Sequence, residues 1–336
     1  MSVIVVGGGP AGLAAAVGSA RLGKGVTLLE KEELGGFPAK HKFHILAPRL
    51  ETYEEVIEPL IKEVKEKRDI FEEIEVIDIV KSDKKFNVAL SDGRTLASDA
   101  LILANGFESF PAESLIEYRA WEYPDVIPSW KLEEMLNPES PTKGIPIRPS
   151  NGKRADEIAV AFCAGSRSRM VGGTYCSLVC CGYSCKQAIE IRKANPNAKV
   201  HMFYMDIRTM GEEESLYWQA QEDHGVHFIR GRLAQVEEKG DKLIAYAEDT
   251  LLNRRVELPV DLISLDMAIM PPKEIGEWGK KLGIELTENG FIRTKNAVET
   301  NVPGLFAAGT ASGPKTIEMS IADGFAAAAL AVTTGE

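Results

Sequence analysis

The fold of this chain is decided by Val3-Ile4-Val5-Val6-Gly7-Gly8-Gly9-Pro10-Ala11-Gly12. Residues 3–6 are apolar and mostly β-branched, which is typical of a buried strand, and the Ala-rich residues 11–22 predict a helix. The turn between them reads G-x-G-x-x-G. In this pattern Gly7 permits a tight turn, Gly9 lets the backbone approach a pyrophosphate, and Gly12 lets the helix pack close to the strand. The helix N-terminus then offers N–H groups and a partial positive charge to phosphates.

A second apolar run, residues 26–30, follows the helix and ends in Glu30. Strand, helix and strand together form a βαβ unit with parallel strands. A carboxylate at the end of the second strand accepts hydrogen bonds from ribose hydroxyls. Glycine-rich turns also occur without ligands, but the strand, the helix and the terminal acid together predict a dinucleotide site.

Length and charge limit the other possibilities. The length of 336 residues suggests roughly two domains, and the apolar content of 44% is enough for a substantial core. The net charge is −11. Acidic and basic residues are intermixed, so we expect no nucleic-acid partner. No apolar stretch is long enough to span a bilayer, and the first strand leaves no room for a secretory signal. We therefore expect a soluble, cytoplasmic protein.

Further along the chain, strand and helix patterns predict two domains. Residues 59–67 predict a surface helix, and residues 75–80, 85–90 and 95–104 predict strands. A second strand–helix–strand unit runs over residues 158–204, after a proline-rich polar segment that is typical of a linker. The chain ends in a helix over residues 315–332. The predicted domains are a discontinuous first domain, residues 1–145 and 266–336, and an inserted domain, residues 146–265.

All five cysteines fall between positions 163 and 185, in the turn of the second unit and the helix that follows it. The spacing is C-x12-C-x3-C-C, with a fifth cysteine one helical turn later. Thiolates are soft ligands, suited to iron–sulfur clusters or zinc. The paired C-x2-C knuckles of structural zinc and the C-x-x-C redox pair are both missing. Some of these thiols could instead be buried small residues. We favour a [4Fe–4S] cluster, with Cys185 as packing and these ligands: Cys163, Cys176, Cys180 and Cys181.

Three segments resemble the thioredoxin-reductase-like flavoproteins and select FAD over NAD. These are residues 30–36, residues 101–106 and residues 301–310. Thr310 stands where the family usually has Asp, so it can donate a hydrogen bond but cannot supply the negative charge. The resemblance implies an α/β, thioredoxin-reductase-like flavoprotein fold with two dinucleotide-binding domains. The cofactor-binding set that we predict is Gly7, Gly9, Pro10, Ala11, Gly12, Glu30, Lys31, Gly35, Gly36, Ile77, Ala104, Asn105, Gly106, Gly309 and Thr310.

The cysteine segments strongly resemble the heterodisulfide reductase A subunit family. The resemblance rests on Cys163-x-Gly165-Ser166-Arg167, on Tyr175-Cys176-Ser177-x-x-Cys180-Cys181 and on residues 203–208. It implies FAD and a cluster in an electron-distributing subunit, with other heterodisulfide-reductase-like subunits as partners and a homodimer. Methanogen members add an N-terminal cluster domain and ferredoxin modules that this sequence does not contain. The short form is similar to the A subunit of the heterodisulfide-reductase-like sulfur-oxidation system.

The resemblance also places a lysine, here Lys186, close to the flavin ring as the candidate catalytic residue. A cation there stabilises the reduced, anionic flavin. The simpler alternative is a surface lysine on the helix. For the whole chain, two other functions stay open: an autonomous NAD(P)H-dependent disulfide oxidoreductase, and a flavin- or zinc-binding scaffold without catalysis. The missing C-x-x-C pair and the missing second glycine fingerprint speak against the first.

Overall fold

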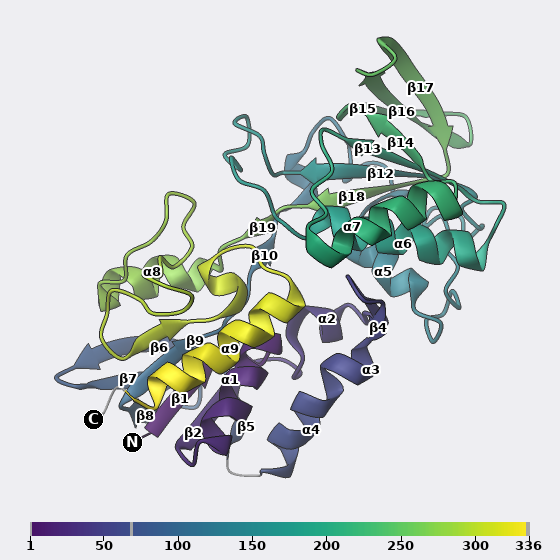
Figure 1. Cartoon of the computed structure of the whole chain (residues 1–336). Helices are drawn as coiled ribbons and strands as arrows, with labels where there is room; N and C mark the ends of the chain where they lie inside the picture. Colours follow the sequence, from purple (N-terminus) through teal and green to yellow (C-terminus); the bar gives the residue numbers. More distant parts are fainter. Residues whose placement is uncertain (1, 68–69, 334–336) are drawn as a thin grey trace. The chain divides into compact units, whose positions relative to one another are not determined.

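The computed structural model describes residues 2–67 and 70–333, and these fold into two compact units (Figure 1). Unit 1 contains residues 1–40, 54–108 and 269–336, and unit 2 contains residues 41–53 and 109–268. Each unit is built on a five-stranded parallel sheet that carries helices. The α/β class with two dinucleotide-type domains is therefore as the sequence predicts.

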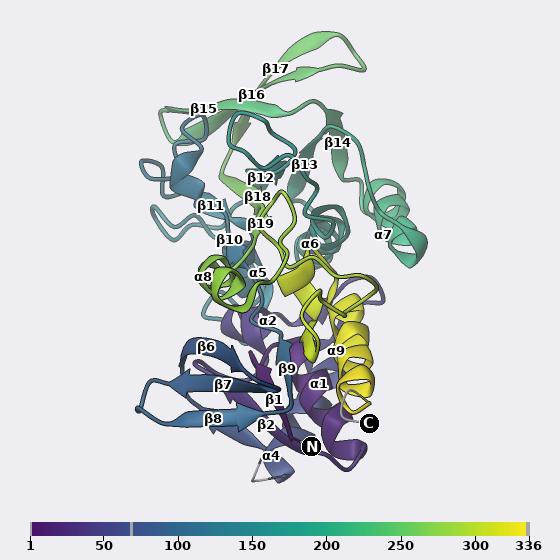
Figure 2. The ribbon, with the colours of Figure 1, turned by 90° about the vertical axis from the view of Figure 1, so that its left-hand side faces the viewer.

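Unit 1 is built on a sheet with the strand order β20–β9–β1–β2–β5, in which every neighbouring pair is parallel. The strands are β1 (Ser2–Val6), β2 (Gly25–Glu30), β5 (Phe71–Glu73), β9 (Ala100–Leu103) and β20 (Leu305–Ala307). Two helices, α1 (Pro10–Arg21) and α9 (Ile317–Ala331), lie side by side (Figure 2). Small residues allow this approach, because a Cβ on Gly324 of α9 would overlap the carbonyl of Ala11.

Unit 1 also contains an antiparallel sheet of β6 (Val76–Ser82), β7 (Lys85–Leu90) and β8 (Thr95–Ser98). The sequence predicts one strand over residues 95–104, whereas the structure has two, β8 and β9, which belong to different sheets. The apolar face of α8 (Lys273–Leu282) packs on the core that this sheet shares with the parallel one. The remaining helices around this unit are α2 (Gly36–Lys40), α3 (Tyr53–Val56), α4 (Glu58–Glu66) and η4 (Gly309–Ser312).

Unit 2 repeats the parallel arrangement with the order β11–β18–β12–β13–β14. The strands are β11 (Val126–Pro128), β12 (Glu157–Ala164), β13 (Lys199–Tyr204), β14 (His227–Arg230) and β18 (Leu262–Met267), and β15 (Leu233–Lys239), β16 (Lys242–Asp249) and β17 (Arg254–Val260) form an antiparallel sheet. Its helices are α5 (Ser129–Leu136), α6 (Cys180–Ala194) and α7 (Glu214–Trp218), with two short 3-10 helices, η1 (Ala112–Ser114) and η2 (Gly211–Glu213), and a π-helix, η3 (Gln219–Asp223).

The units divide the chain at different residues from those that the sequence suggests. Residues 109–145 belong to unit 2, because β11 pairs with β18 and α5 packs against α6. Residues 41–53, with β3 (Ile45–Leu46) and β4 (Glu51–Thr52), also belong to unit 2. The chain passes between the units near β10 (Glu108–Ser109) and β19 (Ile269–Met270). Within the described residues, no helix has the length and apolar character needed to cross a membrane.

Candidate functional site

The glycine-rich turn of unit 1 is held by backbone packing that only glycine allows. Gly7 has a φ of +104°, and a Cβ there would overlap the carbonyl of Ala104. A Cβ on Gly12 would overlap the carbonyl of Gly7. The turn and the start of α1 are thus locked together by close contacts. This is the geometry that the G-x-G-x-x-G pattern predicts.

Gly9 differs from its neighbours because space remains beside it. A Cβ at Gly9 would meet only Gly36 Cα, at 3.9 Å. Gly9 is the N-cap of α1, no side chain caps this end, and Pro10 stands in the first turn. An uncapped helix N-terminus beside open space fits a pyrophosphate, because it presents N–H groups and a partial positive charge.

The predicted acid and the second glycine pair border the same turn. One carboxylate oxygen of Glu30 accepts a hydrogen bond from Gly8 N at 2.5 Å, and the other accepts one from Glu32 N at 2.9 Å. Gly35 N donates to Gly8 O at 2.8 Å, and a Cβ on Gly36 would stand 2.8 Å from Gly9 Cα. The structure therefore brings the glycine-rich turn of residues 7–12 and the segment of residues 30–36 together around one space, which we call the cradle.

Asn105, just after β9, provides an independent sign of a ligand site. Its Oδ1 and Nδ2 atoms are both buried, and neither has a hydrogen-bond partner in the described part of the chain. A buried amide without partners costs about 1–3 kcal/mol. It lies between Ala104, whose N donates to Val6 O, and Gly106, which has a φ of +76°. A bound cofactor that hydrogen-bonds this amide would remove the cost.

The segment at the end of β20 also reaches the cradle. A Cβ on Gly309 would stand 2.7 Å from the Cβ of Ala11 in the first turn of α1, and Gly309 has a φ of +64°. Thr310 follows in η4 and is half-buried. The remaining two predicted residues are peripheral: Lys31 pairs with Glu274 at 3.3 Å, and Ile77 is 56% exposed on β6. A cofactor contact at Lys31 or Ile77 stays a prediction.

In unit 2 the corresponding turn is replaced by a long loop. β12 ends at Ala164 and α6 begins only at Cys180, so residues 165–179 stand where a dinucleotide fold has a tight turn. The loop folds back on itself, with Ser168 bridged to Gly173. Arg167 in this loop forms an ion pair with Asp206, just beyond β13. The acid that would otherwise be available to a ribose is therefore engaged by the loop.

The four predicted ligand thiols influence one another electrostatically. Burial raises the pKa of the Cys163 thiol, and Cys176 raises it further. Burial raises the pKa of Cys181 to about 12, with added contributions from Cys163 and Cys176. Burial also raises the pKa of Cys180 well above its usual range, and the other three predicted ligands act in the same direction. Burial raises the pKa of the Cys185 thiol as well, but of the four predicted ligands only Cys181 adds to the rise.

The backbone around these thiols has features of a functional loop. Leu178 N donates to Cys176 Sγ and Arg208 N donates to Cys181 Sγ, both at 3.4 Å. Cys163, Arg167 and Leu178 all have positive φ, between +53° and +67°. Such conformations cost energy in non-glycine residues and gather at ligand sites.

A site for a single metal ion would need several ligand side chains that converge on one point. Within residues 2–67 and 70–333, no group of three or more His, Cys, Asp or Glu side chains is close enough to hold one. Tetrahedral zinc requires four ligands about 2.0–2.3 Å from one centre. A four-iron cluster is larger than one ion and needs its four thiolates farther apart. Four thiolates are a soft donor set that suits an iron–sulfur cluster.

A buried carboxyl group beside the cysteines is absent from the sequence prediction. Asp266, on β18, is fully buried and accepts hydrogen bonds of 2.9 Å from Ser184 Oγ. Burial raises its pKa well above the usual range, against hydrogen bonds from Ser184 and Tyr183. It lies near enough to raise the pKa of Cys180. Only an apolar strand pattern was visible at this position, so no sequence signal identified it.

Lys186 lies in the interior of unit 2, so the surface-lysine alternative is wrong. The residue is 1% exposed, and its ammonium forms ion pairs with Glu133 of α5 and with Glu190 at 3.1 Å. It also donates to Ile45 O at 3.1 Å. Burial alone would lower the pKa of Lys186, but the two carboxylates outweigh burial and the pKa is raised. Removal of this cation would leave the carboxylates of Glu133 and Glu190 buried without their counter-charge, so Lys186→Ala is expected to destabilise the protein.

Lys186, Glu133 and Glu190 form a buried charged triad, and the Glu190 carboxyl predicts how the stability of the protein depends on pH. Burial raises the pKa of Glu190 from 4.5 to about 7, against the attraction of Lys186. Between these values the unfolded chain loses a proton that the folded protein keeps, so the free energy of unfolding falls as pH rises. Glu190→Gln should remove this fall and make the protein more stable than wild type at pH 8 by roughly 3 kcal/mol.

Urea unfolding at pH 4.5, 6 and 8 measures this difference. The two proteins should be similar at pH 4.5, where Glu190 is neutral, and should diverge as pH rises. Glu222→Gln, a change at an exposed glutamate of the same unit, is the matched control and should follow wild type. Parallel curves for Glu190→Gln and wild type would show that Glu190 ionises normally.

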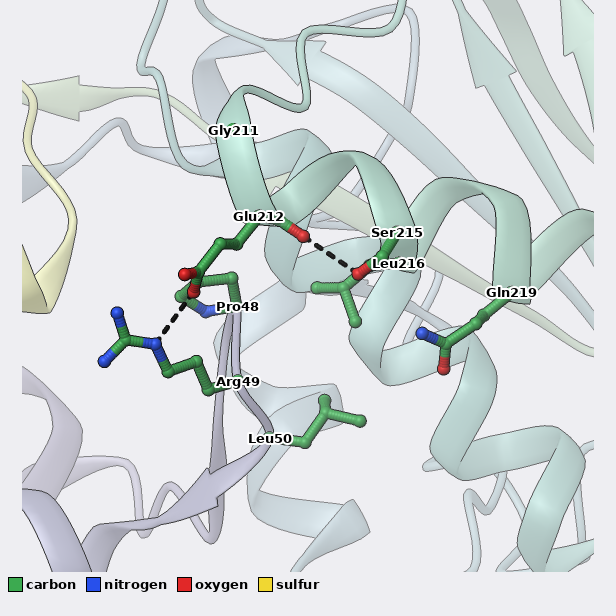
Figure 3. Close-up of a pocket in the computed structure, with 8 residues that line it drawn as sticks. All are labelled: Pro48, Arg49, Leu50, Gly211, Glu212, Ser215, Leu216 and Gln219. Carbon is green, nitrogen blue, oxygen red and sulfur yellow. Dashed lines mark hydrogen bonds and ion pairs between the residues drawn. The ribbon is translucent and has the colours of Figure 1, made fainter.

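A groove in unit 2 is lined by residues other than those of the predicted site. It has a volume of about 470 Å³ and is lined by residues of the 48–50 segment and of the α7 region (Figure 3). Arg49 Nε donates to Glu212 Oε2 at 2.8 Å across it, and both side chains are exposed. No predicted site residue lines the groove, so we assign no cofactor to it.

Comparisons with known proteins agree with the fold. Residues 1–324 match the family described as pyridine nucleotide-disulphide oxidoreductase. Among solved structures, the chain is similar to T. acidophilum thioredoxin reductase, with a TM-score of 0.70 and 18% identity over 99% of this chain and 98% of that one. Lactococcus lactis thioredoxin reductase gives the same values. The predicted thioredoxin-reductase-like fold is therefore confirmed.

The chain is more similar in sequence to several curated proteins, all of them A subunits of heterodisulfide reductases. The iron-sulfur A subunit of the CoB–CoM heterodisulfide reductase from Methanocaldococcus jannaschii is 40% identical over 235 residues, which are 68% of this chain and 36% of that protein. The A subunit of the ferredoxin:CoB–CoM heterodisulfide reductase from Methanosarcina mazei is 37% identical over 68% of this chain and 30% of that protein. The resemblance to this family of subunits is confirmed, although the matched region is about a third of each relative.

Proposed function

Because this chain belongs to the pyridine nucleotide-disulphide oxidoreductase family, an oxidoreductase family whose fold implies flavin, we propose that it is an electron-transfer subunit that holds FAD in unit 1 and a [4Fe–4S] cluster in unit 2. Electrons would pass between these cofactors and partner subunits. By likeness to the relatives, the partners are other heterodisulfide-reductase-like subunits. The assembly is proposed to act in cytoplasmic sulfur oxidation, and the chain is proposed to form a homodimer.

The observation that carries the FAD assignment is the side-chain amide of Asn105, which has no hydrogen-bond partner among the residues that the structure describes. It is buried just after β9, in the same unit as the uncapped N-terminus of α1. A dinucleotide supplies what both lack, namely phosphate oxygens for the helix N–H groups and polar atoms for the amide. The glycine contacts around Gly9 leave room for its pyrophosphate. When bound, FAD supplies the one- and two-electron chemistry of the protein.

The cluster assignment rests on the thiols of unit 2. Cys163, Cys176, Cys180 and Cys181 interact with one another, and two of them accept backbone N–H groups at sulfur. Hydrogen bonds to ligand sulfurs are one of the means by which proteins set cluster potentials. These residues would hold the cluster, and Cys185 would pack in the core.

Lys186 remains our candidate for tuning the flavin. Its positive charge is fixed by Glu133 and Glu190 within unit 2. Because these carboxylates offset the ammonium, the effect on a flavin potential would come from the triad as a whole. A potential measured for Glu190→Gln would report it without leaving a buried charge unpaired.

Anaerobic purification tests the proposal as a whole. A flavin spectrum with a broad brown shoulder, one FAD per chain, and equal iron and sulfide at four per chain are expected. Flavin without iron would remove the cluster from the proposal. Colourless protein, or protein with zinc in place of iron, would support the scaffold alternative.

The competing function, an autonomous NAD(P)H oxidoreductase, leads to a separate expectation. The loop of residues 165–179 and the Arg167–Asp206 pair stand where a nicotinamide dinucleotide would place its phosphates and ribose. NADH or NADPH added without oxygen should therefore leave the flavin oxidised over minutes. Dithionite, which needs no binding site, is the control and should bleach it at once. Rapid bleaching by either nucleotide would favour the alternative.

A further inference from the structure

Thr310 leaves the segment of residues 301–310 without the carboxylate that the resembled flavoproteins usually have there, and the structure brings another carboxylate to the same turn. Asp323 lies on α9, the helix that follows the turn of Thr310. Its Oδ2 atom accepts a hydrogen bond from Gly309 N at 3.1 Å. The carboxylate is therefore placed against the backbone of the turn in which Thr310 lies.

Lys315 fixes this carboxylate in place. Its ammonium forms an ion pair with Asp323 Oδ2, with the two side chains 20% and 12% exposed. Lys315 also donates to Ser312 Oγ at 2.7 Å, and Ser312 Oγ donates to Gly309 O at 3.1 Å. Both bonds of Asp323 fall on Oδ2. Within residues 2–67 and 70–333, no hydrogen bond reaches Oδ1.

The turn that carries this group borders the start of α1. Gly309 faces the Cβ of Ala11, and Gly324, next to Asp323, packs against the backbone of Ala11. Ala11 lies in the first turn of α1, where the proposed pyrophosphate binds. All of these residues belong to unit 1. The carboxylate thus lies beside the proposed dinucleotide site and not elsewhere on the surface.

We propose that Asp323, positioned by Lys315, supplies the carboxylate that Thr310 cannot, and that it accepts a hydrogen bond from a hydroxyl group of FAD. A carboxylate that accepts from a hydroxyl makes a charge-assisted bond, which is stronger than the bond that a threonine hydroxyl can make. The inference rests on the proposed FAD site and adds two residues to it.

Flavin-free protein titrated with FAD, followed by flavin fluorescence, measures the effect directly. Asp323→Asn and Lys315→Met should each bind FAD about 10- to 100-fold more weakly than wild type, because the bond to the charged group is lost or misplaced. Glu318→Gln removes an exposed carboxylate from the first turn of the same helix and should bind like wild type.

A rescue experiment separates this role from a purely structural one. Thr310→Asp, added to Asp323→Asn, restores a carboxylate at the usual position and should recover most of the affinity. The same change in wild type should weaken binding, because two carboxylates would then be close together. Thermal unfolding of the flavin-free variants shows whether the turn itself is damaged.

The outcomes are distinct. If wild-type protein binds no FAD, the proposed function fails. If wild type binds FAD and Asp323→Asn binds it equally well, the proposed function stands and the role of Asp323 is overturned. If Asp323→Asn binds weakly and Thr310→Asp does not rescue it, Asp323 only maintains the turn, and the inference is again overturned.

Discussion

Serine in place of any one of Cys163, Cys176, Cys180 or Cys181 is expected to abolish the brown iron–sulfur absorption and reduce iron and sulfide to background. Each thiol would supply one of four ligands, and a serine hydroxyl is a hard, weak donor for iron in this setting. Iron and sulfide analysis, absorption and electron paramagnetic resonance of anaerobic protein measure the loss. FAD content should remain near that of wild type, because the predicted FAD-binding residues lie in the other unit.

Cys185 provides the matched control in the same helix. It is fully buried in the apolar core of unit 2, together with Ile189 and Met202. Burial raises its pKa, and of the other four thiols only Cys181 adds to this rise. Cys185→Ser should keep the cluster and lose about 1–2 kcal/mol of stability, since it buries a hydroxyl group in an apolar site. A variant set in which Cys185 is essential and Cys163 is dispensable would show that the ligand assignment is wrong.

The parts of the fold that the sequence predicts are those set by short-range chemistry. The turn from Gly7 to Gly12 can be recognised because Gly7 and Gly12 are required by backbone contacts within the turn or with the residue that follows the adjoining strand, and Gly9 leaves open space. The order of strand, helix and strand follows from local apolar patterns. The concentration of cysteines between residues 163 and 185 can be recognised for a related reason, because thiols that are spaced closely along the chain need little long-range information to lie in one region, and their role as cluster ligands stays a prediction.

What the sequence does not predict depends on pairing between distant residues. The proline-rich segment before residue 146 is typical of a linker, yet Val126 pairs with Ile263 in the unit 2 sheet. Likewise, nothing near Lys186 in the sequence predicts that Glu133, which lies on a different helix, forms its ion pair. Asp266 and Asp323 are single acids in apolar or helical runs. Their roles depend on residues that are close in the fold but distant in the chain, and local sequence patterns do not report such pairs.

The glycines of unit 1 differ in what a substitution there would test. A side chain at Gly7 or Gly12 would overlap backbone carbonyls, so a variant at either position would be expected to disturb the fold with or without ligand. Gly9 has an extended conformation, with a φ of −73° and a ψ of −176°, and space around its Cβ direction. Valine is compatible with such a backbone. A change at Gly9 therefore acts on whatever occupies that space.

Gly9→Val is accordingly expected to give folded protein that contains no FAD. The added methyl groups would occupy the room left for the pyrophosphate at the N-terminus of α1, and a clash of this kind should weaken binding at least ~100-fold. Flavin content after purification and FAD titration measure this loss, while circular dichroism and thermal unfolding of flavin-free protein should match wild type. Gly25→Val, at a strand position with equally open space, is the control and should retain the cofactor. Full FAD occupancy in Gly9→Val would mean that the pyrophosphate does not bind at this helix terminus.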